Sequence, residues 1–537
     1  MLPCLRAFLP AGLACLVAAP LAAQSTPRPP SAAAVRRAVE TITETDVRNR
    51  IAVIADDSMR GRATPSPELD KTAAYIAAEF QRFGLRPGGD SGTFIQRYRI
   101  RRTQLDSSSF VMAMGRGTSG RWAVGREVAL IQGAFPESTV TAPVVLVVGL
   151  PTDTARPFGD VNVRGTIILQ TISLAQTISL AQPRQQQSLQ SEIFKGIAAG
   201  VRGWVFLLGV PAPLFSGMVR GTLDARLEIG GGQDFIPVPV MGVRDSSAAE
   251  LLRAAGEDLA ALRDSAAQGV RAMQGFTVTV SGRRRVISET SAPNVIGILE
   301  GSDPLLRNEY VFFTGHMDHT GVAGGGAGCT AVGADSICNG ADDDASGTAG
   351  VVELAEAFAT LNPRPRRSLA FMAVSGEERG LWGSGYYANN PAVSLAQTVA
   401  DLNMDMIGRY YDNRPGWRDT ISVIGKEHST LGEVANGVTR QHPELNMRLV
   451  DDLWPSENFY QRSDHINFAR KGVPILFFFN GTHPDYHRPT DSVDRIDAEK
   501  AARIVRMVFY IGLEVANAAQ RPQWDPDSRR RIVEGGN

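Results

Sequence analysis

The chain has 537 residues, which is enough for two or three domains with sizeable hydrophobic cores. Its 55 Lys and Arg residues nearly balance its 56 Asp and Glu residues. Proteins that bind nucleic acids or anionic membranes carry a basic surface, so this balance argues against both kinds of partner.

The first 23 residues have the pattern of a signal peptide. Arg6 supplies a short positive region, and the apolar stretch that follows is too short for a stable membrane anchor. We expect cleavage near Ala23 and a linker over residues 24–40; a buried N-terminal helix is the alternative. Because no later segment is long and apolar enough to span a membrane, we expect an exported protein, periplasmic or extracellular.

Two cysteines, Cys329 and Cys338, would remain after that cleavage, and they flank a short loop beside a Gly-rich run. Disulfides persist in exported proteins, so we predict a bridge between these cysteines rather than two free thiols. Because the loop that the bridge would close is short, we expect its contribution to stability to be modest.

The rest of the chain divides by the spacing of its apolar residues. Residues from about 34 to 94 are expected to be helical, and residues 41–103 to form the N-terminal part of the main domain. Residues 104–285 change to short β-like runs that alternate with helices, and we interpret them as an inserted module. Residues 286–520 form the main part of the main domain, and residues 521–537 form a C-terminal tail.

The main part alternates apolar strands with helices. The predicted strands are 294–299, 310–314, 368–374 and 473–479, and the predicted helices are 348–361 and 500–518. Apolar strands that alternate with helices predict an α/β fold with a mostly parallel central sheet, covered by helices on both faces. Open sheets of this kind bind their ligands at the carboxyl ends of the strands.

Candidate metal ligands follow the predicted strands. His316 and Asp318 alternate in an extended segment, so both side chains can face one site. A metal-bound imidazole needs an acceptor for its second nitrogen, and Asp318 is placed to provide one. The strand 368–374 is followed by Glu377 and Glu378, which project differently, so one can bind metal while the other faces a bound water.

Carboxylates also lie where an ordinary structural role explains them poorly. Three consecutive aspartates, Asp342, Asp343 and Asp344, precede a predicted helix. A helix N-cap accounts for one of them, and a carboxylate that bridges two cations is the functional alternative. Asp405 lies in an apolar strand, where an unpaired carboxylate is costly, so it needs a cation or a strong donor.

Histidines complete the pattern. Five of the seven lie in these motifs or in two later ones: His316, His319, His465, His483 and His487. A set of His, Asp and Glu ligands without cysteine suits zinc and, less specifically, cobalt or manganese. The chain has neither an HExxH motif nor a GxSxG motif, which argues against an ordinary zincin and a serine hydrolase of the nucleophile-elbow type.

The order HxD, GADDDASG, GEE, NMDMIG, SDH and YHxPxD resembles the zinc aminopeptidase family. This family includes bacterial leucyl aminopeptidases, plasma glutamate carboxypeptidase, glutamate carboxypeptidase II and the transferrin receptor. The resemblance covers about residues 293–517. It implies a zinc exopeptidase fold, and the inserted module resembles the protease-associated domain of the larger family members.

The resemblance also implies two zinc ions per chain, bridged by Asp343. The implied ligands of one ion are His316, Asp343 and Asp405, and those of the other are Asp343, Glu378 and His487. Glu377 would act as the general base, Asp318 as the partner of His316, and Tyr460 as a group that steadies the oxyanion. His319 and His483 would lie behind the ligands or contact the substrate.

The implied function is an aminopeptidase that releases N-terminal residues from peptides with a metal-activated water. A carboxypeptidase or dipeptidase of the same fold remains an alternative, because only recognition of the charged terminus separates these activities. A one-zinc glutaminyl cyclase and a non-enzymatic, receptor-like protein are further alternatives. The complete set of five ligand positions argues against both. The sequence leaves the preferred residue and the oligomeric state open.

Overall fold

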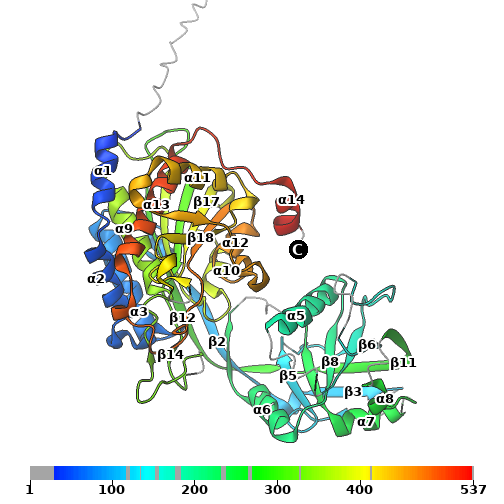
Figure 1. Ribbon diagram of the computed structural model, residues 1–537. Coiled ribbons are helices and arrows are strands. Elements are labelled where there is room, and N and C mark those ends of the chain that lie inside the picture. The colour runs from blue at the N-terminus through cyan, green and yellow to red at the C-terminus, as the bar shows by residue number, and fades with distance from the viewer. Residues whose placement is uncertain are drawn as a thin grey trace, which may run out of the picture.

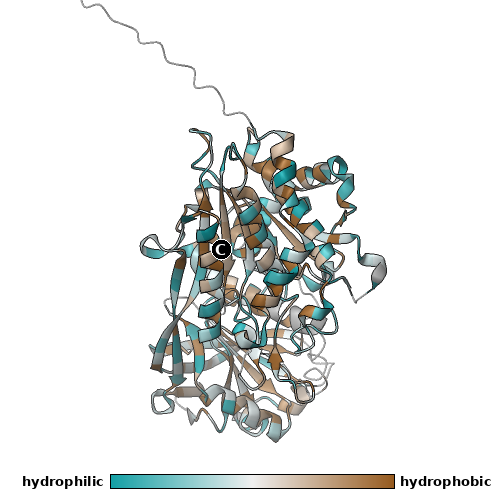
Figure 2. Cartoon of the chain, turned by 90° about the vertical axis from the view of Figure 1, so that its left-hand side faces the viewer, coloured by the Kyte–Doolittle hydropathy of each residue, from teal (hydrophilic) through white to brown (hydrophobic). Residues whose placement is uncertain are grey.

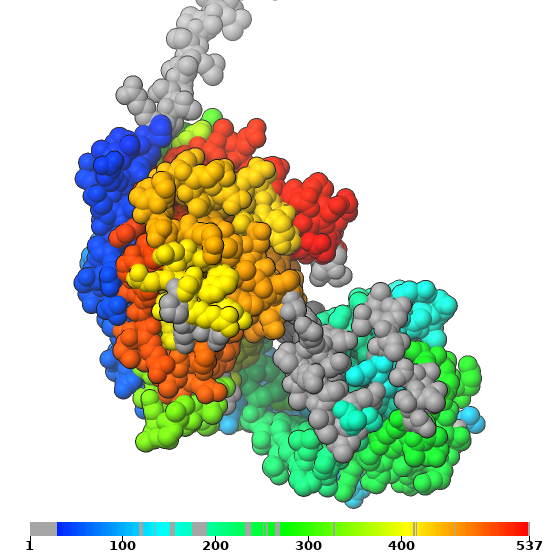
Figure 3. Space-filling model, in the orientation of Figure 1, coloured from blue at the N-terminus to red at the C-terminus, as the bar shows by residue number. Residues whose placement is uncertain are grey.

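The structure is a computed structural model. It describes residues 29–534 except for 117–120, 134, 151–155, 174, 176–182, 231–237, 255, 264–268, 326–327 and 412–413. The predicted signal peptide lies outside the described residues. The chain forms two lobes, each built on its own sheet (Figure 1), and the space-filling view shows the same two bodies (Figure 3).

The larger lobe contains a ten-stranded sheet in the order β19-β18-β20-β17-β13-β16-β12-β2-β9, with β1 beside β12. Its strands are β1 (Arg86–Pro87), β2 (Ile95–Leu105), β9 (Arg226–Ile229), β12 (Arg284–Leu299), β13 (Tyr310–His316), β16 (Ser368–Val374), β17 (Thr398–Met404), β18 (Thr420–Ile424), β19 (Arg448–Val450) and β20 (Ile475–Phe479). The central strands β20, β17, β13 and β16 are parallel, whereas β12, β2 and β9 add antiparallel pairs. The predicted α/β fold is confirmed, with parallel pairing at its centre and a mixed sheet overall.

Helices cover both faces of this sheet. One face packs against α1 (Ala32–Glu40), α2 (Glu44–Ile54), α3 (Pro67–Arg82), α9 (Ala345–Ala359), α11 (Leu431–Gln441) and α13 (Ala498–Asn517). The other face packs against α10 (Trp382–Asn389) and α12 (His465–Ala469). The helices carry hydrophobic and hydrophilic residues side by side (Figure 2), as expected for helices with one buried face.

Both ends of the main domain are more structured than the sequence predicts. The expected linker over 24–40 contains α1, whose residues Ala38 and Val39 are buried in the main core. The expected C-terminal tail contains α14 (Pro526–Arg529) and a further helical turn, Arg530–Glu534. Ile532 of that turn is buried. A few apolar side chains are enough to pack each segment against the core, and so short a set leaves no clear periodicity in the sequence.

The smaller lobe contains an eight-stranded sheet in the order β4-β3-β11-β6-β7-β8-β10-β5. Its strands are β3 (Val111–Gly115), β4 (Arg121–Trp122), β5 (Val128–Gln132), β6 (Val140–Val148), β7 (Ile167–Ile172), β8 (Gly203–Leu208), β10 (Val240–Arg244) and β11 (Gly269–Ser281). Its helices are α5 (Pro183–Ala198), α6 (Ala212–Leu223), α7 (Asp245–Ala254) and α8 (Leu259–Leu262). The lobe corresponds to the module predicted over 104–285, except that β9 pairs with β2 in the large sheet. Its likeness to a protease-associated domain stays a prediction.

Cys329 and Cys338 form the predicted disulfide. Cys338 lies in the short hairpin of β14 (Gly321–Val322) and β15 (Ile337–Cys338), beside the carboxyl ends of the central strands. Within the described part of the chain, no helix has both the length and the apolar character needed to cross a membrane.

Candidate metal centre

Except for Tyr460, the predicted site residues meet at one edge of the large sheet. His316 ends β13, Glu377 and Glu378 follow β16, and Asp405 follows β17. Because β16, β13 and β17 are parallel neighbours, their carboxyl ends lie together. Asp343 comes from the turn before α9.

Asp343 lies between two groups of ligand-type side chains. His316 Nε2 is 3.2 Å from Asp343 Oδ1 and 3.6 Å from Asp405 Oδ1. His487 Nε2 is 3.3 Å from Asp343 Oδ2 and 3.1 Å from Glu378 Oε2. The two oxygens of one carboxylate therefore face two different imidazoles.

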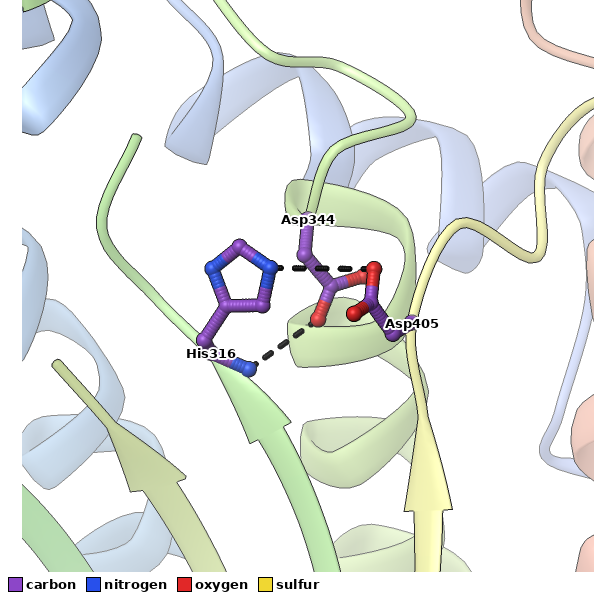
Figure 4. A group of neighbouring side chains, drawn as sticks. All are labelled: His316, Asp344 and Asp405. Carbon is purple, nitrogen blue, oxygen red and sulfur yellow. Dashed lines mark hydrogen bonds and ion pairs between the residues drawn. The ribbon is translucent and has the colours of Figure 1, made fainter. Parts of the chain in front are cut away.

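The three consecutive aspartates have different partners. Asp344 accepts hydrogen bonds from the backbone N–H groups of His316 (3.0 Å), Gly347 (2.8 Å) and Met406 (3.1 Å), which makes it the N-cap of α9. Figure 4 shows the Asp344 carboxylate next to the backbone nitrogen of His316, while the His316 ring points toward Asp405. Asp343 Oδ2 has no hydrogen-bond partner in the described structure, and the two Asp343 oxygens face His316 and His487, so Asp343 is the aspartate placed to bind cations between them.

Asp342 also accepts a hydrogen bond from a backbone N–H group, and its carboxylate faces His483. Its Oδ1 accepts a hydrogen bond from Gly408 N at 2.6 Å. Its Oδ2 lies 3.2 Å from His483 Nε2, and both residues are buried. His483 therefore contacts Asp342, and its role in the site stays a prediction.

His319 lies closer to the second group than the sequence predicts. Its Nδ1 is 2.8 Å from Glu378 Oε1 and 3.7 Å from Asp343 Oδ2, and its ring lies edge-on to the His487 ring. Among the residues that the structure describes, two clusters have metal-ligand spacing: His319, Asp343 and Glu378 form one, and His316, Asp344 and Asp405 form the other. The extended segment after β13 thus sends His316 and His319 to different halves of the site.

The charges in the site are strongly coupled. Burial opposes the charged form of His487, but Asp343 and Glu378 overcome this effect and raise its pKa to about 10. Burial also opposes ionisation of Asp343, yet the facing His319, His316 and His487 hold its pKa well below the usual range. The protonated imidazoles therefore supply the positive charge that balances the carboxylates in this site.

The donor set fits a divalent cation. Asp343 Oδ2, Glu378 Oε1, His487 Nε2 and both ring nitrogens of His319 are buried and lack a hydrogen-bond partner among the described residues. Buried polar atoms without partners are costly, and a cation placed between them would satisfy several at once. Imidazole and carboxylate ligands without thiolates are donors that zinc accepts.

Glu377 and Asp318 stand beside this cluster. Glu377 lines the same pocket as His316, Asp343 and Asp405, and burial raises the pKa of its carboxyl well above the usual range. Asp318 Oδ1 accepts a hydrogen bond from Glu377 N at 3.3 Å and lies 3.7 Å from His316 Nδ1. The nearest acceptor for that nitrogen is the backbone oxygen of Asp318, at 3.2 Å.

Tyr460 does not line the pocket that contains Glu377, so its role at the oxyanion stays a prediction. Tyr460 lies in the 3₁₀ turn Phe459–Gln461, where residues three apart share a face. Phe459 and Arg462 line the pocket, whereas the Tyr460 ring packs 4.7 Å from the ring of His428. Tyr486 is the tyrosine that lines the pocket.

Sequence analysis missed two buried residues that hold the site together. Arg62 donates hydrogen bonds to Met317 O (2.8 Å) and Gly340 O (2.7 Å), and thereby joins the two loops that carry His316 and Asp343. Thr64 Oγ1 donates to Asp318 Oδ2 at 2.8 Å. Arg62 is 255 residues from Met317 in the sequence, and Thr64 is 254 residues from Asp318. No local motif marks Arg62 or Thr64.

The sequence also matches a known family. Residues 294–512 match the family model for Peptidase family M28. These residues form a Peptidase family M28 domain. The match spans most of the segment for which the motifs predict a zinc aminopeptidase, and it confirms that resemblance and the prediction of a peptidase.

Relatives of the M28 domain include probable zinc metalloproteases of fungi. One from Leptosphaeria maculans is 26% identical over 379 residues, which are 61% of this chain and 76% of the relative. One from Pyrenophora tritici-repentis is 32% identical over 323 residues, which are 53% of this chain and 62% of the relative. An aminopeptidase from Aneurinibacillus sp. strain AM-1 aligns over 92% of this chain and 98% of its own, with 20% identity and a TM-score of 0.49.

Proposed function

We propose that the chain is an exported di-zinc exopeptidase, and that it acts as an aminopeptidase. The observation that carries this proposal is the position of Asp343, whose two oxygens each face a different imidazole. A carboxylate in this position is suited to bridge two cations a few ångströms apart, as two-metal hydrolytic sites require. The family match supplies the class of reaction.

The proposed ligands follow from the distances. One zinc would be held by His316, Asp343 and Asp405, and the other by Asp343, Glu378 and His487. His319, 2.8 Å from Glu378, would orient that carboxylate. Cobalt or manganese would accept the same donors.

Zinc held by these residues would polarise the scissile carbonyl and make water a nucleophile at neutral pH. Glu377 faces the same pocket and is not needed as a ligand, so it is placed to accept the proton of the attacking water. It would then pass that proton to the leaving amine. Its raised pKa suits a group that must both take up and return a proton.

The pocket beside Glu377 has an apolar wall that would receive a hydrophobic side chain of the substrate. The wall contains Met406, Phe459, Phe477, Phe479 and Tyr486. Aromatic and thioether groups of this kind favour apolar and aromatic side chains over charged ones. We therefore expect a preference for peptides with a large apolar residue next to the scissile bond.

One observation favours the alternative of a carboxypeptidase or dipeptidase. Arg462 lines the pocket, its side chain is 44% exposed, and its distance to the nearby Glu457 carboxylate is 3.7 Å. The acidic residues that line the same pocket, Asp343, Glu377 and Asp405, all have proposed roles in the metal centre. A guanidinium in this position could bind the free carboxylate of a short peptide.

A substrate panel separates these activities. We expect cleavage of aminoacyl-anilides with Leu, Phe or Met side chains and no cleavage of the N-acetylated forms. Cleavage of N-acetylated dipeptides with a free C-terminus, and its loss in Arg462→Gln, would instead assign the carboxypeptidase or dipeptidase activity. Formation of pyroglutamate from N-terminal Gln, or no turnover at all, would favour the cyclase or the receptor-like protein.

Export is supported by two features. The N-terminal sequence has the composition of a signal peptide, and the Cys329–Cys338 disulfide requires an oxidising compartment to persist. Expression of the full chain with its N-terminus intact should yield a periplasmic or secreted protein that begins near Gln24. A protein retained in the cytoplasm with residues 1–23 uncleaved would contradict this part of the proposal.

Zinc binding to the metal-free protein is expected to release protons at neutral pH. The pKa of His487 is raised to about 10, so its imidazole is protonated there, and only the neutral imidazole binds a metal ion. As the pH rises through about 10, the imidazole becomes neutral and its contribution to the release disappears. Titration calorimetry in buffers of different ionisation enthalpy measures the release; a heat independent of the buffer would contradict it.

A further inference from the structure

A line of buried polar side chains runs through the sheet to Asp405. Asp401 and Asn403 alternate along β17, and Thr314 lies on the neighbouring strand β13, opposite Asn403. Ser463 precedes α12. Asp401, Asn403 and Thr314 are fully buried, and Ser463 is 1% exposed. Alternate residues of a strand share a face, so these side chains and Asp405 lie on the same side of the sheet.

The side chains contact one another in sequence. Thr314 Oγ1 is 2.8 Å from Asp401 Oδ1 and 2.8 Å from Asn403 Oδ1. Asn403 Nδ2 donates to Ser463 Oγ at 3.1 Å. Ser463 Oγ donates to Asp405 Oδ2 at 2.8 Å. Four contacts thus join five groups, and a carboxyl group stands at each end.

The side chains between the two ends carry too few hydrogens for these contacts. The Thr314 and Ser463 hydroxyls have one hydrogen each, and Asn403 turns its N–H₂ to one neighbour and its oxygen to the other. The three groups therefore supply one hydrogen each, which leaves one of the four contacts without a hydrogen. Rotation of the Asn403 amide moves the deficit and does not remove it. The missing hydrogen must belong to one of the two carboxyl groups, Asp401 or Asp405.

We propose that Asp401 carries this proton in the zinc-loaded protein. The proton fixes the direction of the hydrogen-bond chain from Asp401 to Asp405, so that Ser463 always donates to Asp405. The choice of Asp401 rests on the proposed function, because a carboxylate that binds zinc must be ionised. Asp401 is then a positioning residue: it holds one oxygen of Asp405 through three intermediates and leaves the other oxygen, which faces His316, for the metal.

The surroundings of Asp401 favour the neutral acid. Its strand neighbours in register are Phe312 on β13 and Ile475 on β20, and both are apolar. Its second oxygen, Oδ2, has no hydrogen-bond partner in the described structure. Burial, with a smaller contribution from the charge of Asp464, raises the pKa of Asp401 to about 8. A charged carboxylate in this position would be costly, and a neutral carboxyl that donates to Thr314 is not.

Ionisation of Asp401 would reverse the chain. The Thr314 hydroxyl would then donate to Asp401, the Asn403 amide would turn to donate to Thr314, and the Ser463 hydroxyl would donate to Asn403. Asp405 would lose its donor. Loss of such outer contacts lowers metal affinity by about 10–100-fold in other metal sites. The zinc site and the buried proton are therefore coupled.

Infrared spectroscopy of the zinc-loaded full chain tests the proton directly. At neutral pH, the difference spectrum between wild type and Asp401→Asn should show the loss of a protonated carboxyl C=O band, which shifts in D₂O. The variant amide can still donate to Thr314. Glu192→Gln in the smaller lobe serves as a control, because burial raises the pKa of Glu192 to about 8 and its own band should be lost independently. Loss of an ionised carboxylate band in Asp401→Asn, instead of a carboxyl band, would overturn the proposal.

The coupling is tested by zinc affinity as a function of pH. Above about pH 8, wild type should lose zinc affinity by about tenfold relative to Asp401→Asn, because only wild type can ionise there. Thr314→Val should keep the carboxyl band of Asp401. Because it breaks the hydrogen-bond chain, adding Asp401→Asn to Thr314→Val should no longer change the zinc affinity above about pH 8. Parallel affinity curves for wild type and Asp401→Asn would overturn the coupling while leaving the di-zinc site intact. A protein that binds no zinc would remove the proposed function and, with it, the reason to place the proton on Asp401.

Discussion

Replacing Glu377 by Gln is expected to leave the zinc content of the chain unchanged and to lower kcat by about 10²–10⁴-fold. The amide has nearly the same shape as the carboxylate but cannot accept a proton. Glu377 lines the pocket with His316, Asp343 and Asp405. It is not one of the proposed zinc ligands, which contact one another without it. The measurement is steady-state hydrolysis together with metal analysis of the same sample.

The neighbouring glutamate provides a matched control. Glu378 lies 3.1 Å from His487 Nε2, so Glu378→Gln should lose zinc from the second site and lose activity for that reason. The two variants change adjacent residues by the same chemistry and are expected to separate metal binding from proton transfer. Retained turnover in Glu377→Gln would remove its role as the base, and equal zinc loss in both variants would remove the distinction.

Replacing Asp343 by Ala should abolish stable binding of both zinc ions. Each of its oxygens lies within 3.3 Å of a different imidazole, 3.2 Å for His316 and 3.3 Å for His487. Removal of the bridge thus takes one ligand from each site and leaves His316, Asp405, Glu378 and His487 as two incomplete pairs. We expect an affinity loss beyond the roughly 10–100-fold typical of residues behind the ligands. Metal analysis after dialysis measures it.

Asp344→Asn is the matched control for that variant. Asp344 accepts backbone N–H groups with both of its oxygens, whereas Asn has only one oxygen, so the replacement leaves one buried N–H without an acceptor and should cost about 1–3 kcal/mol of stability while sparing the zinc ions. Thermal unfolding and metal analysis distinguish the two effects. If Asp344→Asn lost zinc and Asp343→Ala kept it, the bridging role would belong to Asp344.

The strand-end residues could be predicted because each follows an apolar strand whose type and direction the sequence makes clear. His316 ends β13, Glu378 lies in the loop that follows β16, and Asp405 comes directly after β17, and parallel neighbours bring these positions together. Asp343 required the family motif, since spacing alone does not distinguish it from Asp342 and Asp344. The structure distinguishes them by the backbone amides that two of the three accept.

The remaining features depend on contacts that a local pattern does not encode. Arg62 and Thr64 act on loops more than 250 residues away, at separations of 255 and 254 residues. Tyr460 keeps the expected distance in sequence from Ser463, but the 3₁₀ turn directs its ring toward His428. The missing hydrogen between Asp401 and Asp405 depends on the pairing of β13 with β17, which brings Thr314 beside Asn403.

The number of zinc ions in the purified wild-type chain tests the central claim most directly. Metal analysis after expression with zinc and dialysis against metal-free buffer should give about two zinc ions per chain, as a bridged two-metal site requires. The same sample should hydrolyse aminoacyl-anilides. A stoichiometry of one or zero, in a protein that is folded by circular dichroism, would contradict the bridging role of Asp343 and the di-zinc mechanism built on it.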